Sequence, residues 1–218
     1  MKCVVLIGAG GHSRCLLDVL RLLEGVRAHC VLDRDQNLWG TEVLGTRVAG
    51  DERELSAAID QGTTHFLIAM GGVGRSGLRK KLFEQLSASG LSPLTVQHPT
   101  ACVSRHAAVS AGVQIFAQSV MGPCTTIHEN VIINTGAIVE HDSVVESHSH
   151  IAPRACLLGG VHIAEQCHIG AGAVIRENLS VGAGAIVGAG AVVIRDVPAG
   201  AVVAGVPAKL LKSQNHES

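Results

Sequence analysis

Apolar residues recur at every sixth position from Val103 to Val193, without a gap or an insertion. The residue two positions before each of them is mostly small. This pattern predicts a parallel β-helix, in which each repeat makes one short strand and one corner, and three repeats make one triangular coil. Ordinary buried strands do not keep one register for so long. A single coil cannot bury its own aliphatic side chains, so we expect about five stacked coils to share one core.

A different pattern precedes this six-residue repeat, which we call the ladder, and it predicts a small α/β domain. The run at residues 3–7 is continuously apolar, as in a buried parallel strand. Strands alternating with helices imply a small doubly wound parallel sheet. Further strands are expected at residues 29–33, 65–70 and 94–96, and helical patterns at residues 15–23, at 51–60 and around the basic residues Arg75, Arg79, Lys80 and Lys81.

The glycine-rich turn at residues 8–12 follows the first expected strand. Such glycines let the backbone approach a phosphate at a helix N-terminus. Asp33 ends the second strand, where an acid commonly binds a ribose. The turn lacks the third glycine of the dinucleotide fingerprint, because Ser13 stands there. Nucleotide binding and a plain tight turn therefore both remain open, and His12 is either a phosphate donor or a solvated helix residue.

These patterns divide the chain into three parts. Residues 1–97 form the α/β domain, residues 98–196 the β-helix, and residues 197–218 a C-terminal tail. Pro99 marks the first junction, because a proline favours extended geometry at the residue before it.

Composition narrows the class of protein. Of 218 residues, 47% are hydrophobic and 2% aromatic, with no tyrosine, and the net charge is −1. These values argue against nucleic-acid binding. No apolar run reaches transmembrane length, and the start is unlike a signal peptide. The seven cysteines are scattered, and we interpret them as reduced thiols of a cytoplasmic protein, with a catalytic cysteine as the alternative.

Histidines in the ladder supply the candidate chemistry. His141 precedes Asp142, and an adjacent carboxylate can fix the tautomer of an imidazole and raise its basicity. The pair is a candidate general base, with an exposed corner histidine as the alternative. His148 and His150 share a strand face, but no third ligand completes a metal site, so no metal is expected. His141 and His150 are half a coil apart, which predicts opposite sides of the prism and a site between two subunits.

The ladder resembles the left-handed parallel β-helix of hexapeptide acyltransferases. Residues 133–142, the turn at residues 10–12 and the C-terminal residues 205–209 are similar to one branch, the sugar O- and N-acetyltransferases of the sialic acid, bacillosamine and perosamine pathways. The left-handed sense comes from this resemblance alone. The resemblance implies a homotrimer with acetyl-CoA in the groove between adjacent β-helices, and a tail at residues 197–211 that covers the end of that groove.

The resemblance also implies roles for individual residues. His141 would accept a proton and Asp142 would modulate it, although relatives often carry the longer Glu there. His150 would lie near the acetyl group, and the Gly159 amide near the thioester carbonyl. Small residues, Ala171 and Ala189, would contact the pantetheine arm. The nucleotide-sugar site would comprise Gly10, Gly11, His12, Asp33, Arg34 and Gly71.

The predicted function is acetyl transfer from acetyl-CoA to the 4-amino group of a nucleotide-linked 4-amino-4,6-dideoxy sugar. A GDP-perosamine type of acceptor is favoured, followed by a UDP-linked bacillosamine precursor. One alternative is a sialic acid-type O-acetyltransferase, where a hydroxyl acceptor would make the base more necessary. Another is a non-catalytic trimeric scaffold. An NAD-binding regulatory domain is disfavoured by the missing third glycine.

Overall fold

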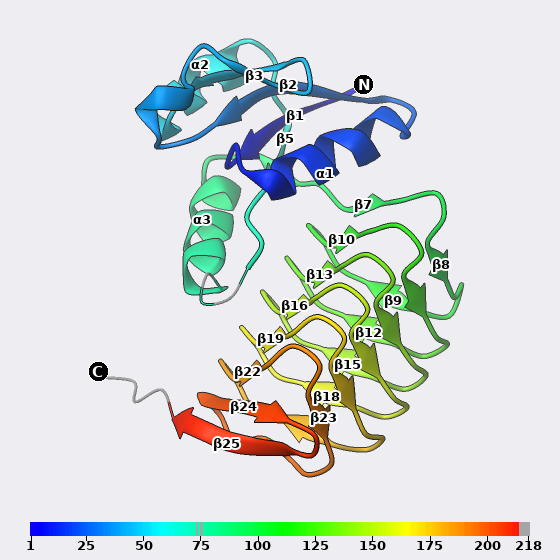
Figure 1. Cartoon of the computed structure of the whole chain (residues 1–218). Coiled ribbons are helices and arrows are strands. Elements are labelled where there is room, and N and C mark those ends of the chain that lie inside the picture. Colours follow the sequence, from blue (N-terminus) through cyan, green and yellow to red (C-terminus); the bar gives the residue numbers. More distant parts are fainter. Residues whose placement is uncertain (73, 75, 214–218) are drawn as a thin grey trace. The chain divides into compact units, whose positions relative to one another are not determined.

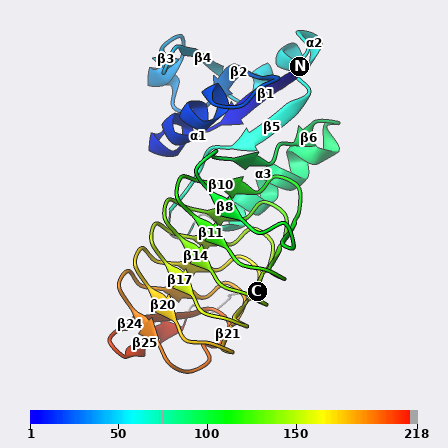
Figure 2. The same cartoon turned by 90° about the vertical axis from the view of Figure 1, so that its right-hand side faces the viewer.

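A computed structural model describes residues 1–72, 74 and 76–213. The chain divides into two compact units, which are considered separately. The first comprises Met1–Gly71 and Lys81–Val96, and the second comprises Gly72–Lys80 and Gln97–Ser218. Figures 1 and 2 show their elements from two directions.

A six-stranded sheet forms the middle of the first unit, in the order β3-β4-β2-β1-β5-β6. The strands are β1 Lys2–Ile7, β2 Val26–Leu32, β3 Glu42–Val43, β4 Thr46–Gly50, β5 His65–Ile68 and β6 Ser92–Pro93. Neighbours from β4 to β6 are parallel, and only the edge strand β3 is antiparallel. The central strand β1 buries Val4, Val5 and Leu6 completely, as its continuous apolar run predicts.

The helices alternate with these strands, so the predicted doubly wound arrangement is confirmed. They are α1 Gly11–Arg21, α2 Leu55–Asp60 and α3 Ser76–Ala88, with short 3-10 helices η1 Gln36–Leu38 and η2 Glu52–Glu54. Arg75, which we expected on the basic helix, lies outside the described residues. The prediction of a strand at residues 94–96 is wrong. The first unit ends its sheet at Pro93, and the next strand already belongs to the β-helix.

The second unit is a left-handed parallel β-helix whose strands repeat every six residues. They begin with β7 Val96–Gln97 and continue as β8 Cys102–Val103, β9 Ala108–Val109, β10 Gln114–Ile115, β11 Val120–Met121, β12 Thr126–Ile127, β13 Ile132–Ile133, β14 Ile138–Val139, β15 Val144–Val145, β16 His150–Ile151, β17 Cys156–Leu157, β18 His162–Ile163, β19 His168–Ile169, β20 Val174–Ile175, β21 Ser180–Val181, β22 Ile186–Val187 and β23 Val192–Val193. Each strand from β7 to β20 pairs with the strand one coil later, as Gln114 does with Ile132.

Three sheets therefore make the faces of a triangular prism, which Figure 2 shows as stacked rungs. We call them the β16 face, the β14 face and the β15 face after one strand in each. The ladder residues from Ile115 to Val193 point inward and are at most 1% exposed. Val109 is 37% exposed because it lies on the first strand of its face. The predicted period and core are confirmed.

A hairpin closes the C-terminal end of the β16 face. It consists of β24 Ala201–Gly205 and β25 Ala208–Ser213. The last coil is two residues shorter than the others, because Ile186 pairs with Val202. The antiparallel β25 then continues the same sheet. Residues 198–213 are thus built into the second unit, where β24 and β25 cover an edge that parallel stacking would leave unpaired.

Candidate active site

His141 lies at the corner that follows β14, before the chain enters β15. Its Nδ1 is 2.8 Å from the Asp142 Oδ2, and the two side chains are 59% and 66% exposed. Asp142 occupies the left-handed region with φ of 60°, which turns the chain and brings its carboxylate back to the ring. A proton on Nδ1, held by this carboxylate, leaves the lone pair of Nε2 available to accept another proton. The corner therefore presents a base to its surroundings.

Gly159 lies one coil beyond His141 and provides the space in which the ring rests. A Cβ at this position would be 2.5 Å from the His141 Cε1 and 2.6 Å from its Nε2. Such distances are far below van der Waals contact, so only glycine permits the observed ring position. Within the described residues, the Gly159 N–H has no hydrogen-bond acceptor, whereas the next amide, that of Gly160, donates to the His141 carbonyl at 2.9 Å. A free N–H thus lies beside the imidazole.

His150 and His168 lie one coil apart on the β16 face, at outward strand positions. They are nevertheless only 8% and 9% exposed, and their rings meet edge to face with centroids 5.0 Å apart. Burial lowers the pKa of His168, so its ring is neutral at pH 7. His162 occupies the same repeat position on the β15 face, but its side chain is 44% exposed. Outward position alone does not determine exposure in this β-helix.

The rings of His150 and His168 both line a pocket of about 400 Å³ within the second unit. One part of its lining is the glycine-rich segment before and within the first turn of α3, namely Gly72, Gly74, Ser76 and Gly77. The other part is the β16 face with its adjacent corner, including His150 and His168. The pocket therefore has two walls. We call the segment that carries Gly72, Gly74 and Gly77 the glycine-rich wall, and the part of the β16 face that carries His150 and His168 the imidazole wall.

Asn134 fixes the tautomer of His150, a role that the sequence did not reveal. The Asn134 Oδ1 accepts a hydrogen bond from the Thr135 N–H at 2.8 Å, so its amide nitrogen faces the ring. That nitrogen is 3.0 Å from the His150 Nε2, which must accept. A neutral His150 therefore carries its proton on Nδ1. Asn134 belongs to the segment that carries the family resemblance, but an outward amide alone gave no indication of its partner.

The remaining residues expected near acetyl-CoA lie at another corner. Ala171 and Ala189 are exposed, one coil apart, on the corner between the β16 and β14 faces. His141 and Gly159 lie on the corner between the β14 and β15 faces, opposite the β16 face that carries His150. The prediction that His141 and His150 lie on opposite sides of the prism is confirmed. One β-helix cannot bring all these residues into a single pocket.

In the first unit, the glycine-rich turn leads from β1 into α1. Gly10 and Gly11 are exposed, and a Cβ at either would meet no described atom within 4 Å. His12 is half-buried in the first turn of α1. This open turn ends at the N-terminus of an 11-residue helix, a geometry that suits an anion.

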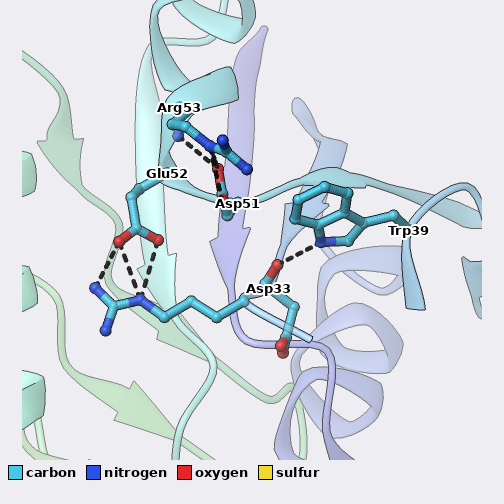
Figure 3. A network of polar contacts seen from close by, with 6 residues as sticks. Asp33, Trp39, Asp51, Glu52 and Arg53 are labelled. Carbon is cyan, nitrogen blue, oxygen red and sulfur yellow. Dashed lines mark hydrogen bonds and ion pairs between the residues drawn. The ribbon is translucent and has the colours of Figure 1, made fainter. Parts of the chain in front are cut away.

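Asp33 holds this turn in place. Its Oδ2 accepts from the Ala9 N–H at 2.6 Å, and its Oδ1 accepts from the Asp35 N–H at 2.9 Å. Its carbonyl also accepts from the Trp39 indole at 2.8 Å, as Figure 3 shows. The acid that we expected at a ribose thus supports the loop as well, with lone pairs still available for a hydroxyl.

Arg34 and Gly71 complete the expected nucleotide-sugar residues. The Arg34 guanidinium lies on Glu52, with Nε 3.0 Å from Oε1, and the pair is exposed. Figure 3 shows the Glu52 carboxylate in this contact. Gly71 follows β5 and is half-buried. Since β1 and β5 are adjacent and parallel, the turn after β1 and the segment after β5 lie at the same edge of the sheet.

A buried arginine is the largest feature that the sequence analysis missed. Arg79, expected only as part of a basic helix, is 2% exposed and contacts the β-helix at Asn130 and His148. It falls on the same helical stripe as Phe83 and Leu86, which are also buried. A charged residue on the apolar stripe of a helix was the available signal.

Among the described residues, no three His, Cys, Asp or Glu side chains are grouped so that they could hold a metal ion. None of the helices formed by residues 1–72, 74 and 76–213 has both the length and the apolar character that crossing a membrane requires.

Known proteins share both units of this chain. Residues 3–86 match the family model of the PglD N-terminal domain, and residues 142–177 match that of the bacterial transferase hexapeptide (six repeats). GDP-perosamine N-acetyltransferase of Escherichia coli O157:H7 is 30% identical, with 97% of each chain covered. UDP-N-acetylbacillosamine N-acetyltransferase of Bacillus subtilis (strain 168) is 35% identical over 118 residues, which span 54% of this chain and about half of that relative, 52%.

Solved structures agree with these relatives. PerB from Caulobacter crescentus, in complex with CoA and GDP-perosamine, has a TM-score of 0.90 and 34% identity, with 97% of this chain and 98% of that chain covered. The acetyltransferase domain of PglB from Neisseria gonorrhoeae FA1090 has a TM-score of 0.85 and 33% identity, with 97% of this chain and all of that chain covered. The same domain is also known in complex with acetyl coenzyme A.

Proposed function

The chain belongs to the hexapeptide-repeat N-acetyltransferases of nucleotide-linked amino sugars, and we propose that it transfers an acetyl group from acetyl-CoA to the 4-amino group of a nucleotide-linked 4-amino-4,6-dideoxy sugar. A GDP-linked sugar of the perosamine type is the favoured acceptor, since two of the relatives with nearly complete coverage act on or bind GDP-perosamine. A UDP-linked bacillosamine precursor comes next. The relatives favour this function over O-acetylation and over a non-catalytic scaffold.

The corner of His141, Asp142 and Gly159 carries this proposal. The sugar amine attacks the thioester carbonyl, and a C–N bond forms as the carbonyl oxygen becomes an oxyanion. His141 accepts the proton of the amine at Nε2, while Asp142 holds Nδ1. The C–S bond then breaks, and the thiolate of CoA takes up a proton from the imidazolium or from solvent. We assign the free N–H of Gly159 as a donor to the oxyanion.

We propose that the complete site forms between copies of the chain in a homotrimer. The His141 corner of one copy would face the β16 face of its neighbour, where His150 and the pocket lie. The position of these residues on opposite sides of one prism supports this arrangement. In it, Ala171 and Ala189 are small enough to admit the pantetheine arm along the groove.

Mixed assemblies test the shared site. Subunits with His141→Ala and subunits with His150→Ala are each expected to be nearly inactive alone. After unfolding and co-refolding, about a quarter of the interfaces in a trimer combine an intact corner with an intact pocket, and activity returns accordingly. A mixture as inactive as its components would contradict a site between copies.

We propose that the first unit binds the nucleotide of the acceptor. Gly10 and Gly11 present an open backbone at the start of α1, where helix N–H groups can bind a pyrophosphate. His12 supplies a further donor, and Asp33 keeps the turn in shape while it accepts a ribose hydroxyl. Arg34 and Gly71 would line the same site.

The first measurement is thiol release from acetyl-CoA with a panel of GDP-, UDP- and dTDP-linked 4-amino sugars, with CMP-sialic acid and free sialic acid as hydroxyl controls. Release with one amino sugar is the expected result and identifies both the reaction and the acceptor. Release with the hydroxyl acceptors alone would overturn N-acetylation. No release in a correctly folded trimer that binds a nucleotide sugar would favour the scaffold.

A further inference from the structure

The Arg79 guanidinium joins the first turn of α3 to two successive coils of the β-helix. Its Nη2 donates to the Asn130 carbonyl at 2.6 Å and to the Asn130 Oδ1 at 2.9 Å. Its Nη1 donates to the His148 carbonyl at 3.3 Å. Asn130 and His148 are 18 residues apart, so they occupy the same corner one coil apart. A planar fork of donors fits this pair of acceptors, whereas a single ammonium does not.

Stability alone does not account for this arrangement. Burial lowers the pKa of Arg79 to about 9, so the side chain remains charged at neutral pH. The acceptors in these hydrogen bonds are neutral, and no carboxylate of the described residues forms an ion pair with Arg79. An apolar side chain would be less costly to bury than such a cation. The neighbouring Lys80 shows the opposite case, because it pairs with Glu165 at 3.3 Å on the surface.

The hydrogen bonds define the orientations of the Asn130 amide and the His148 ring. Because the Asn130 Oδ1 accepts from Arg79, the Asn130 amide nitrogen faces the His148 Nδ1, at 2.9 Å. That ring nitrogen must accept, so a neutral His148 carries its proton on Nε2. Burial, with the positive charge of Arg79 second, lowers the pKa of His148 to about 4. The ring therefore stays neutral at physiological pH and the network keeps one arrangement.

Two members of this network, Arg79 and His148, also line the pocket on the β16 face. Arg79 comes two residues after Gly77, which belongs to the glycine-rich wall, and His148 comes two residues before His150, which belongs to the imidazole wall. The three glycines of that wall, Gly72, Gly74 and Gly77, contribute no side chain by which it could pack in place. We propose that Arg79 is a positioning residue that holds the glycine-rich wall against the β16 face and so shapes the pocket before substrates bind. Only the catalytic consequence of this proposal rests on the proposed function.

Arg79→Gln tests the catalytic consequence, with Lys80→Gln as the matched control on the same helical turn. Loss of the fork is expected to misplace the wall and lower kcat about 10²-fold, since small misplacements of reacting groups carry penalties of that size. The KM for the nucleotide sugar should change less than about threefold, because the nucleotide binds in the first unit. Lys80→Gln removes a partly exposed ion pair and should leave kcat within about twofold.

The number of correctly folded sites must be measured separately from the turnover rate of each site. Calorimetric titration with CoA gives the number of competent sites, and kcat is expressed per such site. If Arg79 contributes only to stability, Arg79→Gln will show fewer sites but a normal kcat per site, and that result would overturn the proposal. Arg79→Lys, which keeps the cation but loses the fork, should lower kcat per site about tenfold. A wild-type kcat in Arg79→Lys would overturn it equally.

A second readout is independent of any activity. The His148 ring can be followed by NMR titration, and its pKa is expected to rise when Arg79→Gln removes the neighbouring charge. The pKa in Lys80→Gln should rise less, because Lys80 contributes less than Arg79 to the lowering. An unchanged His148 in Arg79→Gln would overturn the contact itself. Because this titration needs no substrate, it tests the contact between Arg79 and His148 even if no sugar is acetylated.

Discussion

His141 and His150 lie in consecutive parts of one β-helix, yet the exposure of their side chains is opposite. The His141 side chain is 59% exposed and has Asp142 as its partner, with Gly159 beneath the ring. His150 is 8% exposed, and its tautomer is set by Asn134. A single chain therefore completes the surroundings of His150 but leaves His141 facing outward. A catalytic group in such a position is useful only when another surface meets it, which supports a site shared between copies.

Removal of the exposed imidazole should have the largest effect. His141→Ala is expected to lower kcat about 10²–10⁴-fold, because general base catalysis contributes a factor of this size. Folding should be unaffected, because an exposed ring contributes little to the core. Steady-state thiol release measures the loss, and His128→Ala, at an exposed histidine of the same β-helix, is the control. A wild-type rate in His141→Ala would refute its role as the base.

Gly159→Ala tests whether the ring position matters as well as the ring. The new Cβ would be 2.5 Å from the His141 Cε1, so the exposed imidazole must swing away. We expect kcat to fall about 10²-fold, since the displaced His141 Nε2 no longer lies where it can accept the proton of the amine. The double variant Gly159→Ala/His141→Ala should be no slower than His141→Ala alone, because the displaced ring is absent. An additive loss would show that Gly159 acts through its backbone instead.

The β-helix could be predicted almost completely from the sequence, and the reason is physical. Its core repeats one environment, so the inward position at every sixth residue is aliphatic and the register follows from the period. The first unit was less predictable at its edges. The β3–β4 hairpin pairs Glu42 with Arg47, and its two short strands contain no apolar run. The strand expected at residues 94–96 failed because Val96 pairs with the β-helix rather than with the sheet.

The His141–Asp142 pair and the buried Arg79 network also differ in how far they could be predicted from the sequence. His141 and Asp142 are adjacent in sequence, so their contact could be predicted from spacing. The buried network joins Arg79 to residues 51 and 69 positions away, and no local pattern encodes such distances. Charge placed on the apolar stripe of α3 was the one available signal. Local chemistry is readable from sequence, whereas the burial of polar groups depends on which distant surface covers them.

The buried imidazole of His148 should make stability depend on pH. The folded pKa of His148 is about 4, below the unfolded value of 6.5, so the unfolded chain binds more protons between these values. The contribution of neutral His148 to the free energy of unfolding is therefore fully present above pH 6.5 and is lost as the pH falls toward 4. Between pH 7 and pH 5 we expect a loss of about 2 kcal/mol from this residue.

Urea denaturation at pH 7 and pH 5, at one protein concentration, measures this difference. His148→Gln keeps an acceptor for Asn130 and should remove most of the pH dependence. Equal pH dependence in the wild type and in His148→Gln would contradict the neutral buried state of His148.

The smallest effect should come from the partners that hold two equivalent histidines. His150 and His162 occupy the same repeat position, and each is held by a residue 16 positions earlier, Asn134 or Glu146. Asn134→Ala should lower kcat about tenfold, because His150 loses the donor that selects its tautomer inside the pocket. Glu146→Ala should stay within about twofold, since an exposed pair contributes little. Equal losses in both variants would mean that the β16 face has no special role, and that the difference between the two rings is one of burial alone.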